Sequence, residues 1–524
     1  MNRWRAVVAA ALGLTTLIAS TPATAAPRPQ ATVHWTACPT YSEEALRVMA
    51  PPDRLDRFRE LLARLECGTV SVPLDHDRPR GRHITVALTR LKAADQARRL
   101  GSLALNPGGP GGSGYLMPVE LLTMSAAGDL HERYDLIGFD PRGVGYSTKT
   151  DCTPPAEEPA PPATKAEARR VYDLQVRVNA ECGRSDPAFL GSLTTANVAR
   201  DLDGIRAGLG ERKLHFVGVS WGTWLGVVYR DLFPASAGRM FLDSVAIPRF
   251  DLATFREVRA AAAERNSLRF AAWTAERDDR YGFGTTPEQV REALIAVRKD
   301  YDAHPRQFTD VAMPFDGRFV ALAASQSAPV WPLAAQVLAE LRDATGPTAP
   351  PTVKEVTGEP EEPSEPPADL PERGNETMGH AAFCNEDPSR LGFEDAWAAY
   401  RRRLADNPLT GRASGDFDAG CAGWPLPVQP VRLHHGGSSL VLSGHRYETP
   451  SPYEWTPQMR AVAGGRVYTV DDDVHGSVLN EPACAADLVA YFTTGRIDGG
   501  CPGAPVPAAT AARTAFSNTG DRLP

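Results

Sequence analysis

A serine flanked by glycines is the clearest candidate for chemistry in this sequence. Residues 218–222 read Gly-Val-Ser-Trp-Gly, and Leu214–Val217, a predicted buried strand, comes directly before them. A helical pattern begins near Thr223, so the serine lies between a predicted strand and a predicted helix. A nucleophilic serine on a tight strand-to-helix turn has this context, which pushes its hydroxyl into a cleft. Ser220 is therefore our candidate nucleophile. The alternative is a glycine-rich turn with an uninvolved serine.

Acyl transfer to a serine also requires hydrogen-bond donors for the oxyanion that develops. A glycine-rich segment, residues 106–114 (Asn-Pro-Gly-Gly-Pro-Gly-Gly-Ser-Gly), follows the predicted strand Ser102–Leu105. In hydrolases with a serine turn of this kind, such a loop presents backbone amides to the nucleophile. We assign the oxyanion hole to the N–H groups of Gly109 and Trp221. A phosphate-binding loop is the alternative, but no Lys-Ser/Thr pair follows the glycines.

A base for the serine hydroxyl is expected late in the chain, because the order in this arrangement is serine, acid, histidine. The sequence has eleven histidines, and only His475 follows the last predicted strand, Arg466–Val470. The adjacent His434 and His435 lack a spaced third ligand, which favours a solvated turn over a metal site. A serine, a histidine and a carboxylate need no metal and no cofactor.

The acid should follow the preceding strand, Ser439–Ser443. Glu448 is the first carboxylate of the loop that comes next. A glutamate can do an aspartate's work of fixing the imidazole tautomer and stabilising the imidazolium. We therefore predict Glu448 as the acid. Glu454, further along the same loop, and Asp243, after an earlier strand, are the alternatives.

Strand and helix patterns alternate through the first half of the chain, which indicates a mostly parallel sheet flanked by helices. The expected strands are His83–Leu91, Ser102–Leu105, Tyr134–Asp140, Leu214–Val217 and Arg239–Val245, followed late in the chain by Ser439–Ser443 and Arg466–Val470. Apolar residues from Val198 to Leu209 are spaced four, three and four apart. This spacing places them on one face of a helix.

The alternation stops after about residue 247 and returns after about residue 430. Between these limits we expect helices, such as Leu252–Arg277 and Pro287–His304. The Pro/Glu-rich loop 345–374 is too polar to fold alone. An interrupted sheet predicts a helical cap inserted into an α/β core. The expected division is a leader at 1–25, a first core part at 26–247, a cap at 248–430 and a second core part at 431–524.

The N-terminus has the pattern of a secretory signal peptide. Basic residues precede an apolar run from Ala6 to Ile18, and residues 23–25 read Ala-Thr-Ala, the small-residue spacing that signal peptidase cleaves. A membrane anchor is the alternative, but a spanning helix needs about 20 apolar residues and this run has about 13. We therefore expect a secreted, extracellular protein without stable membrane insertion after cleavage.

Eight cysteines fit an oxidising compartment, in which disulfides persist. In chain order they are Cys38, Cys67, Cys152, Cys182, Cys384, Cys421, Cys484 and Cys501. Pairing of successive cysteines would close four local loops, each stabilising the fold by roughly 3 kcal/mol. The spacing alone leaves the connectivity open. No C-x-x-C pair occurs, which argues against a thiol-redox centre or a zinc ribbon.

The charge balance argues against two classes of partner. The sequence has 64 acidic and 56 basic residues and a formal net charge of −8. An acidic surface repels nucleic acid and anionic lipid, so we expect no nucleic-acid partner. The sequence gives no indication of the oligomeric state.

Taken together and in this order, the motifs resemble those of the secreted tripeptidyl aminopeptidases and prolyl-aminopeptidase-like enzymes of the α/β-hydrolase fold. The resemblance includes the glycine loop at 106–111, the D-x-x-G-x-D-x-R-G-x-G pattern within 134–145, the serine motif, and the segments around Glu448 and His475. It spans most of the chain from Cys67 to Cys501 and includes the C-terminal segment typical of that group. It implies a serine peptidase with a capped α/β-hydrolase fold.

Three departures from the family pattern bear on the site. The acid loop has one extra residue and Glu448 in place of the usual aspartate, Trp221 stands where tyrosine is commoner, and the Pro/Glu-rich loop is longer.

An exopeptidase must also bind a free α-ammonium, which calls for a carboxylate in low dielectric. Residues 384–386 (Cys-Asn-Glu) resemble the family's cysteine-centred cap motif. Glu386 is thus the candidate amine-binding residue, and Asp387 the weaker alternative.

The resemblance implies a secreted serine aminopeptidase that releases short peptides, tripeptides among them, from peptide substrates with a free N-terminus. A secreted esterase or lipase with the same three side chains is the alternative enzyme. It would have an apolar acyl tunnel and no carboxylate facing the cleft. A catalytically silent binding protein on a hydrolase scaffold is a further alternative, because fold alone does not establish activity. Every expected catalytic position carries a competent side chain, which favours an enzyme.

Overall fold

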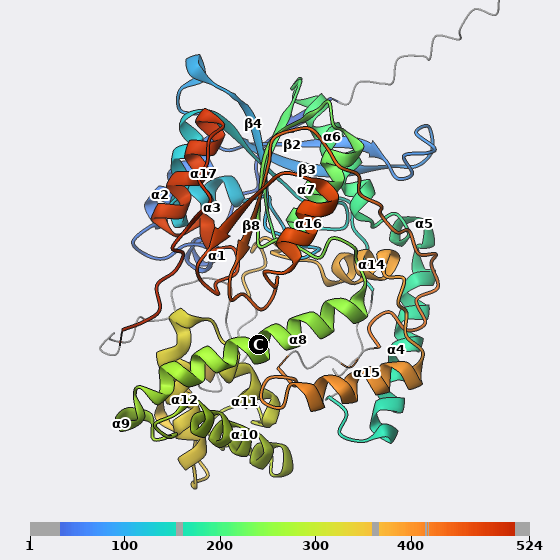
Figure 1. The fold of residues 1–524 in the computed structure, drawn as a ribbon. Helices are drawn as coiled ribbons and strands as arrows, with labels where there is room; N and C mark the ends of the chain where they lie inside the picture. The colour runs from blue at the N-terminus through green and yellow to red at the C-terminus, as the bar shows by residue number, and fades with distance from the viewer. Residues whose placement is uncertain (1–31, 153–160, 359–365, 414–416, 418, 509–524) are drawn as a thin grey trace, which may run out of the picture. The chain divides into compact units, whose positions relative to one another are not determined.

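The computed structural model describes residues 32–152, 161–358, 366–413, 417 and 419–508, so the expected leader at 1–25 lies outside the described residues. A ten-stranded sheet forms the centre, in the order β1-β2-β3-β5-β4-β6-β7-β8-β9-β10 (Figure 1). Its strands are β1 (Val33–Thr36), β2 (Glu66–Pro73), β3 (His83–Leu91), β4 (Gly101–Asn106), β5 (Tyr134–Phe139), β6 (Leu214–Val219), β7 (Ala237–Asp243), β8 (Leu440–His445), β9 (Arg466–Val470) and β10 (Gly500–Cys501).

The sheet is antiparallel at one end and parallel elsewhere. Strands β1, β2 and β3 pair antiparallel with their neighbours, and β3 pairs antiparallel with β5. Every pair from β5 through β4, β6, β7, β8 and β9 to β10 is parallel. Parallel neighbours end at the same edge of a sheet, which brings together the loops that follow β6, β7, β8 and β9.

Helices cover both faces of the sheet, as Figure 1 shows. One face carries α1 (Glu43–Met49), α2 (Leu55–Arg64), α3 (Met117–Met124) and α17 (Pro482–Thr494), and the other carries α6 (Thr195–Gly208), α7 (Trp221–Leu232) and α16 (Trp455–Ala463). The buried strand β4 shows how the layers form. Leu103 and Leu105 pack in the first layer and Ala104 in the second, because successive side chains of a strand point to opposite faces. The predicted mostly parallel sheet flanked by helices is confirmed.

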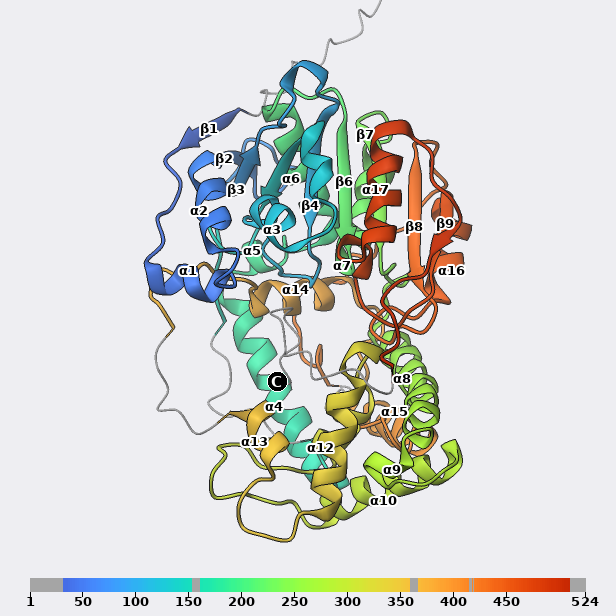
Figure 2. The same cartoon turned by 90° about the vertical axis from the view of Figure 1, so that its left-hand side faces the viewer.

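A second group of helices lies beyond the edge of the sheet where the parallel strands end (Figure 2). They are α8 (Leu252–Ala275), α9 (Asp278–Tyr281), α10 (Pro287–Ala303), α11 (Gly317–Ala324), α12 (Trp331–Asp343) and α13 (Pro351–Thr357), which share one hydrophobic cluster, and α14 (Glu376–Glu386) and α15 (Phe393–Asp406). We call these helices the cap. None of the described residues between β7 and β8 forms a strand of the sheet.

Two details of the cap differ from the expectation. Helix α4 (Lys165–Ser185) falls within the first core part expected at 26–247, but Ala168 of α4 packs with Phe393 and Tyr400 of α15. The Pro/Glu-rich segment 345–374 contains α13, whose Val353 is buried in the cap cluster. Residues 359–365 of that segment lie outside the described residues. A proline at the first helical position suits a helix start, so this composition did not prevent a short helix.

All eight cysteines form disulfides, and the pairing is sequential. The bonds are Cys38–Cys67, Cys152–Cys182, Cys384–Cys421 and Cys484–Cys501. The sequence separations run from 17 to 37 residues. Among the described residues, no helix is both long and apolar enough to cross a membrane.

We expect the disulfides to contribute substantially to stability. Loops of these lengths give about 3 to 4 kcal/mol each on the chain-entropy model. Adding a reducing agent to the folded protein should therefore lower the melting temperature measured by calorimetry. Alkylation of unreduced, denatured protein, followed by mass spectrometry, should label none of the eight cysteines. Eight alkylated thiols in exported protein would contradict the prediction.

Candidate functional site

Ser220 lies in the turn between β6 and α7, and its backbone is strained. Its φ of +58° and ψ of −124° fall where residues with side chains are rarely found. The flanking glycines make the turn possible. A Cβ at Gly218 would come within 2.4 Å of the Gly222 carbonyl oxygen, and one at Gly222 within 2.7 Å of Asn106 Oδ1. Ser220 thus has the backbone of a nucleophile elbow, and its N–H donates to the Asp243 carbonyl at 3.0 Å.

The glycine loop after β4 packs directly against this turn. A Cβ at Gly108 would lie 2.9 Å from Ser220 Cβ and 3.2 Å from the Trp221 nitrogen. Trp221 is the first residue of α7, so its N–H has no acceptor within the helix. Gly109 follows Gly108 in the loop. The two N–H groups predicted as the oxyanion hole therefore belong to adjoining segments beside Ser220.

Glu448 and His475 meet at the same edge of the sheet. Glu448 lies in the loop after β8 and His475 in the loop after β9, and His475 Nδ1 is hydrogen-bonded to Glu448 Oε1. The Glu448 side chain is fully buried, whereas His475 is 34% exposed. With Nδ1 engaged by the carboxylate, Nε2 is the ring nitrogen left to accept a proton. We call Ser220, Glu448 and His475 the triad.

The loop around Glu448 holds its carboxylate in place. The Ser451 N–H donates to Glu448 Oε1 at 3.0 Å, and the Glu448 N–H donates to the His445 carbonyl at 3.3 Å. Glu448 Oε2 is buried with no hydrogen-bond partner among the described residues. The free energy of this carboxylate therefore depends strongly on its bond to His475, because a buried acceptor with few partners is costly.

The two alternative acids are engaged elsewhere. Glu454 precedes α16 and pairs with Arg265 of α8 at 2.9 Å, with 40% of its side chain exposed. Asp243 ends β7, is fully buried, and its Oδ1 lies 2.9 Å from Nε2 of His445. The geometry therefore favours Glu448 over both as the partner of His475.

Glu386, predicted to bind the substrate's amine, is almost fully buried and hydrogen-bonded within the protein. It is the last residue of α14 and is 4% exposed. Its Oε1 accepts the Thr195 N–H at 2.6 Å and its Oε2 accepts the Trp224 indole N–H at 3.0 Å. Burial raises the pKa of this carboxyl. Glu386 therefore ties α14 to α6 and α7, and these contacts favour a structural role for it.

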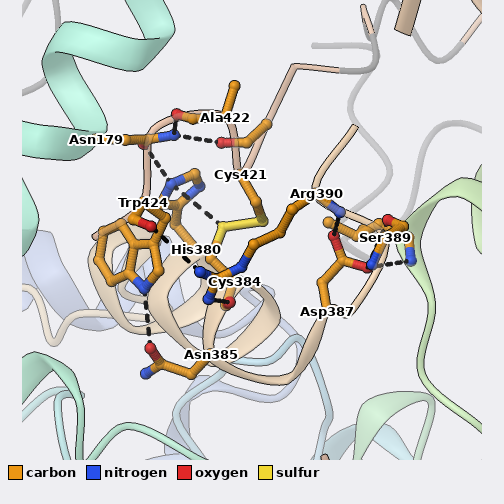
Figure 3. Close-up of a disulfide and its surroundings, with 12 residues drawn as sticks. Asn179, His380, Cys384, Asn385, Asp387, Ser389, Arg390, Cys421, Ala422 and Trp424 are labelled. Atoms are coloured by element: carbon orange, nitrogen blue, oxygen red, sulfur yellow. Dashed lines mark hydrogen bonds between the residues drawn. A yellow bond between two sulfur atoms is a disulfide. The ribbon is translucent and has the colours of Figure 1, made fainter. Parts of the chain in front are cut away.

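The neighbouring Asp387 is engaged in the same way. It is 1% exposed, and its Oδ1 accepts the Leu252 N–H at 3.0 Å, at the start of α8, and the Ser389 hydroxyl at 2.7 Å. Figure 3 shows Asp387 turned toward Ser389 and Arg390. Both acids of this motif are thus buried and bonded within the protein.

The Cys384–Cys421 disulfide fastens α14 to the segment that follows α15 (Figure 3). Asn385 Oδ1 accepts the Trp424 indole N–H at 2.9 Å. His380, one turn before Cys384, lies 2.7 Å from Asn179 of α4, and burial lowers its pKa to about 4. The cysteine-centred motif therefore has a structural role, since its side chains join α14, α4 and the chain around Trp424.

His445 and Asp472 lie behind the triad, and no motif in the sequence indicates them. His445 Nδ1 is 2.6 Å from Asp472 Oδ1. The run of three aspartates before His475 was a visible signal, but the order of residues does not tell which of them are buried. The Asp471 side chain is 59% exposed, whereas those of Asp472 and Asp473 are 1% exposed.

Comparison with known families agrees with this geometry. The profile of a family described as "alpha/beta hydrolase fold" matches residues 102–285, and that of a family described as "TAP-like protein" matches residues 407–502. The tripeptidyl aminopeptidase of Streptomyces lividans is 32% identical over 459 residues, which cover 83% of this chain and 82% of that protein. Serine protease Hip1 of Mycobacterium tuberculosis is 27% identical over 534 residues, 94% of this chain and 95% of that protein.

A shorter match lies in an esterase. Carboxylesterase B of Mycobacterium tuberculosis is 36% identical over 173 residues, 30% of this chain and 33% of that protein. The sheet, the strained serine turn and the family profiles together define an enzyme, a serine hydrolase of the α/β-hydrolase fold. The match to the Streptomyces enzyme, which covers most of both chains, indicates the family within the serine hydrolases. The chain belongs to the tripeptidyl aminopeptidase family, and it is a serine peptidase.

We expect Ser220→Ala to abolish hydrolysis while the fold stays intact, because the change removes the nucleophile and only a hydroxyl's volume. The loss in kcat for a peptide anilide should be roughly 10⁴-fold or more. Labelling by a fluorophosphonate should disappear with it, and the melting temperature should stay near that of the wild type. A variant that keeps a few per cent of the wild-type rate would show that Ser220 is not the nucleophile.

Glu448→Gln and Glu454→Gln form a matched pair. The amide N–H₂ of a glutamine at 448 would face His475 Nδ1 and favour the wrong tautomer, so kcat should fall on the order of a thousandfold. Glu454→Gln removes a half-exposed ion pair worth about 0 to 1 kcal/mol and should leave kcat unchanged. Steady-state kinetics of both variants give the comparison. The reverse ranking would assign the acid to Glu454.

Proposed function

We propose that this chain is a secreted serine aminopeptidase that removes short peptides, up to tripeptides, from the free N-termini of peptides. The observation that carries the proposal is the hydrogen bond between buried Glu448 and His475, at the sheet edge where Ser220 has an elbow backbone. The names of the two long relatives, a tripeptidyl aminopeptidase and a serine protease, support peptides as substrates. Four disulfides support an oxidising destination outside the cytoplasm.

In the proposed mechanism, Ser220 Oγ attacks the scissile carbonyl carbon while His475 Nε2 takes the hydroxyl proton. The N–H groups of Gly109 and Trp221 donate to the oxyanion of the tetrahedral intermediate. Glu448 holds the His475 tautomer and stabilises the imidazolium. His475 then gives its proton to the leaving amine, the rest of the substrate departs, and the N-terminal short peptide stays attached to Ser220 as an ester. Water, deprotonated by His475, hydrolyses this ester.

Recognition of the substrate's amine is the part of the proposal without an assigned residue. Glu386 is 4% exposed and both of its oxygens accept N–H bonds within the protein, which favours a different carboxylate as the ammonium acceptor. An esterase is the second candidate function, because the match to carboxylesterase B covers part of this chain at 36% identity. An esterase would use the same triad without an amine site.

Acetylation of the substrate's N-terminus separates the two functions. Acetylation removes the positive charge and leaves the acceptor carboxylate beside a bulkier neutral group, which typically costs about 2 to 5 kcal/mol. We therefore expect kcat/KM for an N-acetylated tripeptide anilide to be roughly thirtyfold or more below that of the free tripeptide anilide. A panel of one, two and three residues shows in addition how many are released per cut.

Glu386→Gln is the matched control in this assay. Glutamine cannot accept both N–H bonds, so the melting temperature should fall, whereas the ratio of free to acetylated kcat/KM should stay as in the wild type. Equal rates for free and acetylated peptides would rule out an amine site and favour the esterase. A ratio that collapses in Glu386→Gln would restore Glu386 as the amine-binding residue.

A further inference from the structure

A second histidine lies directly behind the triad, held between two carboxylates. His445 is the last residue of β8 and its side chain is fully buried. Its Nε2 is 2.9 Å from Asp243 Oδ1, and its Nδ1 is 2.6 Å from Asp472 Oδ1. We call Asp243, His445 and Asp472 the ion triplet. The mechanism above assigns none of these side chains a role.

The contacts of the ring indicate its protonation state. An ionised carboxylate only accepts hydrogen bonds, so a ring nitrogen beside it must donate. A neutral imidazole has a single N–H, whereas His445 faces carboxylate oxygens at both nitrogens. Burial acts against the charged ring, but Asp243, Asp472 and the more distant Glu448 raise the pKa of His445 well above its ordinary value. The ring is therefore an imidazolium with both N–H groups bound.

The second carboxylate is anchored independently of the ring. Asp472 Oδ2 accepts the Ser477 hydroxyl at 2.7 Å and the Ala504 N–H at 2.8 Å. Burial opposes ionisation of Asp472, but its hydrogen bond with His445 holds its pKa below the ordinary range. The Ser477 hydroxyl also lies 3.4 Å from His445 Nδ1. Because each ring nitrogen is bound to a carboxylate, the His445 ring is held in one orientation.

Each member of the ion triplet is also joined through the backbone to a member of the triad or its loop. The Asp243 carbonyl accepts the Ser220 N–H at 3.0 Å, and the His445 carbonyl accepts the Glu448 N–H at 3.3 Å. The Asp472 carbonyl accepts the Tyr447 N–H at 2.9 Å, one residue before Glu448. Asp472 also stands three residues before His475 in the same loop. The ion triplet thus spans the ends of β7, β8 and β9, from which the catalytic loops start.

We propose that His445 is the positioning residue of the triad. As a cation bonded to both neighbouring strand ends, it fixes the loops of Glu448 and His475 relative to the Ser220 turn. The triplet also has a net charge of one negative unit behind His475. Because charges interact strongly in a buried, low-dielectric setting, that charge stabilises the imidazolium that His475 becomes during acyl transfer. This inference rests on the triad of the proposed function, but not on the substrate.

The first test uses a fluorophosphonate, which labels an activated serine whatever the enzyme's natural substrate. His445→Gln removes the cation and leaves two buried carboxylates facing a neutral amide. The second-order rate of Ser220 labelling should fall on the order of a hundredfold, as expected when catalytic groups are displaced by about 1 Å. The matched control is His131→Gln, since His131 is a buried histidine that lies 2.8 Å from the neutral Lys92 carbonyl. It should lose stability but keep its labelling rate.

The second test measures protonation directly and does not depend on that variant folding. In wild-type protein labelled with ¹⁵N at histidine, the His445 resonances should show both ring nitrogens protonated at neutral pH, above the ordinary histidine pKa of about 6.5. Asp472→Asn should leave His445 protonated through Asp243 and remove the net negative charge. The acid limb of the labelling rate, the pH range in which the rate falls as the pH drops, should then move to lower pH. The reason is that His475 loses its proton more readily without that charge. Mere structural damage would lower the rate at every pH and leave the limb in place.

Three results would overturn the proposal. They are a folded His445→Gln that labels at the wild-type rate, a neutral His445 in wild-type protein at neutral pH, and an acid limb that stays in place or moves to higher pH in Asp472→Asn. None of them bears on peptide specificity. Failure of the aminopeptidase proposal would appear in the comparison of free and acetylated peptides, while these labelling results would stand.

Discussion

The strained backbone at Ser220 is the constraint on which the rest of the site depends. A positive φ at a residue with a side chain costs about 1 to 3 kcal/mol, and it persists only where the surroundings over-determine it. Here the surroundings are the two glycines that let β6 and α7 approach, the hydrogen bond from the Ser220 N–H to Asp243, and the glycine loop that touches Ser220 Cβ. Relaxing any of them would let the turn move and displace the Ser220 hydroxyl.

The parallel sheet then brings the remaining groups to that turn. Strands β6, β7, β8 and β9 are parallel neighbours, so the residues that follow them, distant in sequence, lie along one edge. Glu448 and His475 come from adjacent strand ends, which is why their side chains meet. Asp243 ends β7 and His445 ends β8, the two strands that lie between β6 and β9 in the sheet. Catalytic and positioning groups thus arise from the same topological feature.

Much of this arrangement could be predicted from local patterns. The strands His83–Leu91 and Arg466–Val470 have the predicted bounds, because apolar alternation and turn residues delimit them. The elbow and the glycine loop were predictable because a tight turn and close backbone contact demand glycine. Strands β1, β2 and β10 were not predicted. β1 and β10 are four and two residues long, and pairing with distant neighbours defines them.

The sequence could not show which acidic side chains are buried or which groups they contact. Glu386 and Glu448 are both buried glutamates, yet each oxygen of Glu386 accepts an N–H, whereas Glu448 keeps one oxygen without a partner and bonds to His475 through the other. That difference is set by which helices pack nearby, and α14 reaches Glu386's partners only through the fold of the whole chain. A motif can therefore name an acidic residue without indicating which groups surround it.

The cap contacts the catalytic loop through one buried carboxylate. Asp473, two residues before His475, accepts the Ala328 N–H at 2.9 Å and bonds to Asn266 and Arg269 of α8 at 3.1 Å. The Arg269 guanidinium also stacks on Tyr447, 3.8 Å from the ring centroid. Because these contacts flank both His475 and Glu448, a displacement of α8 would move the loops that carry them. Asp473 and Arg269 therefore join α8 of the cap to both loops.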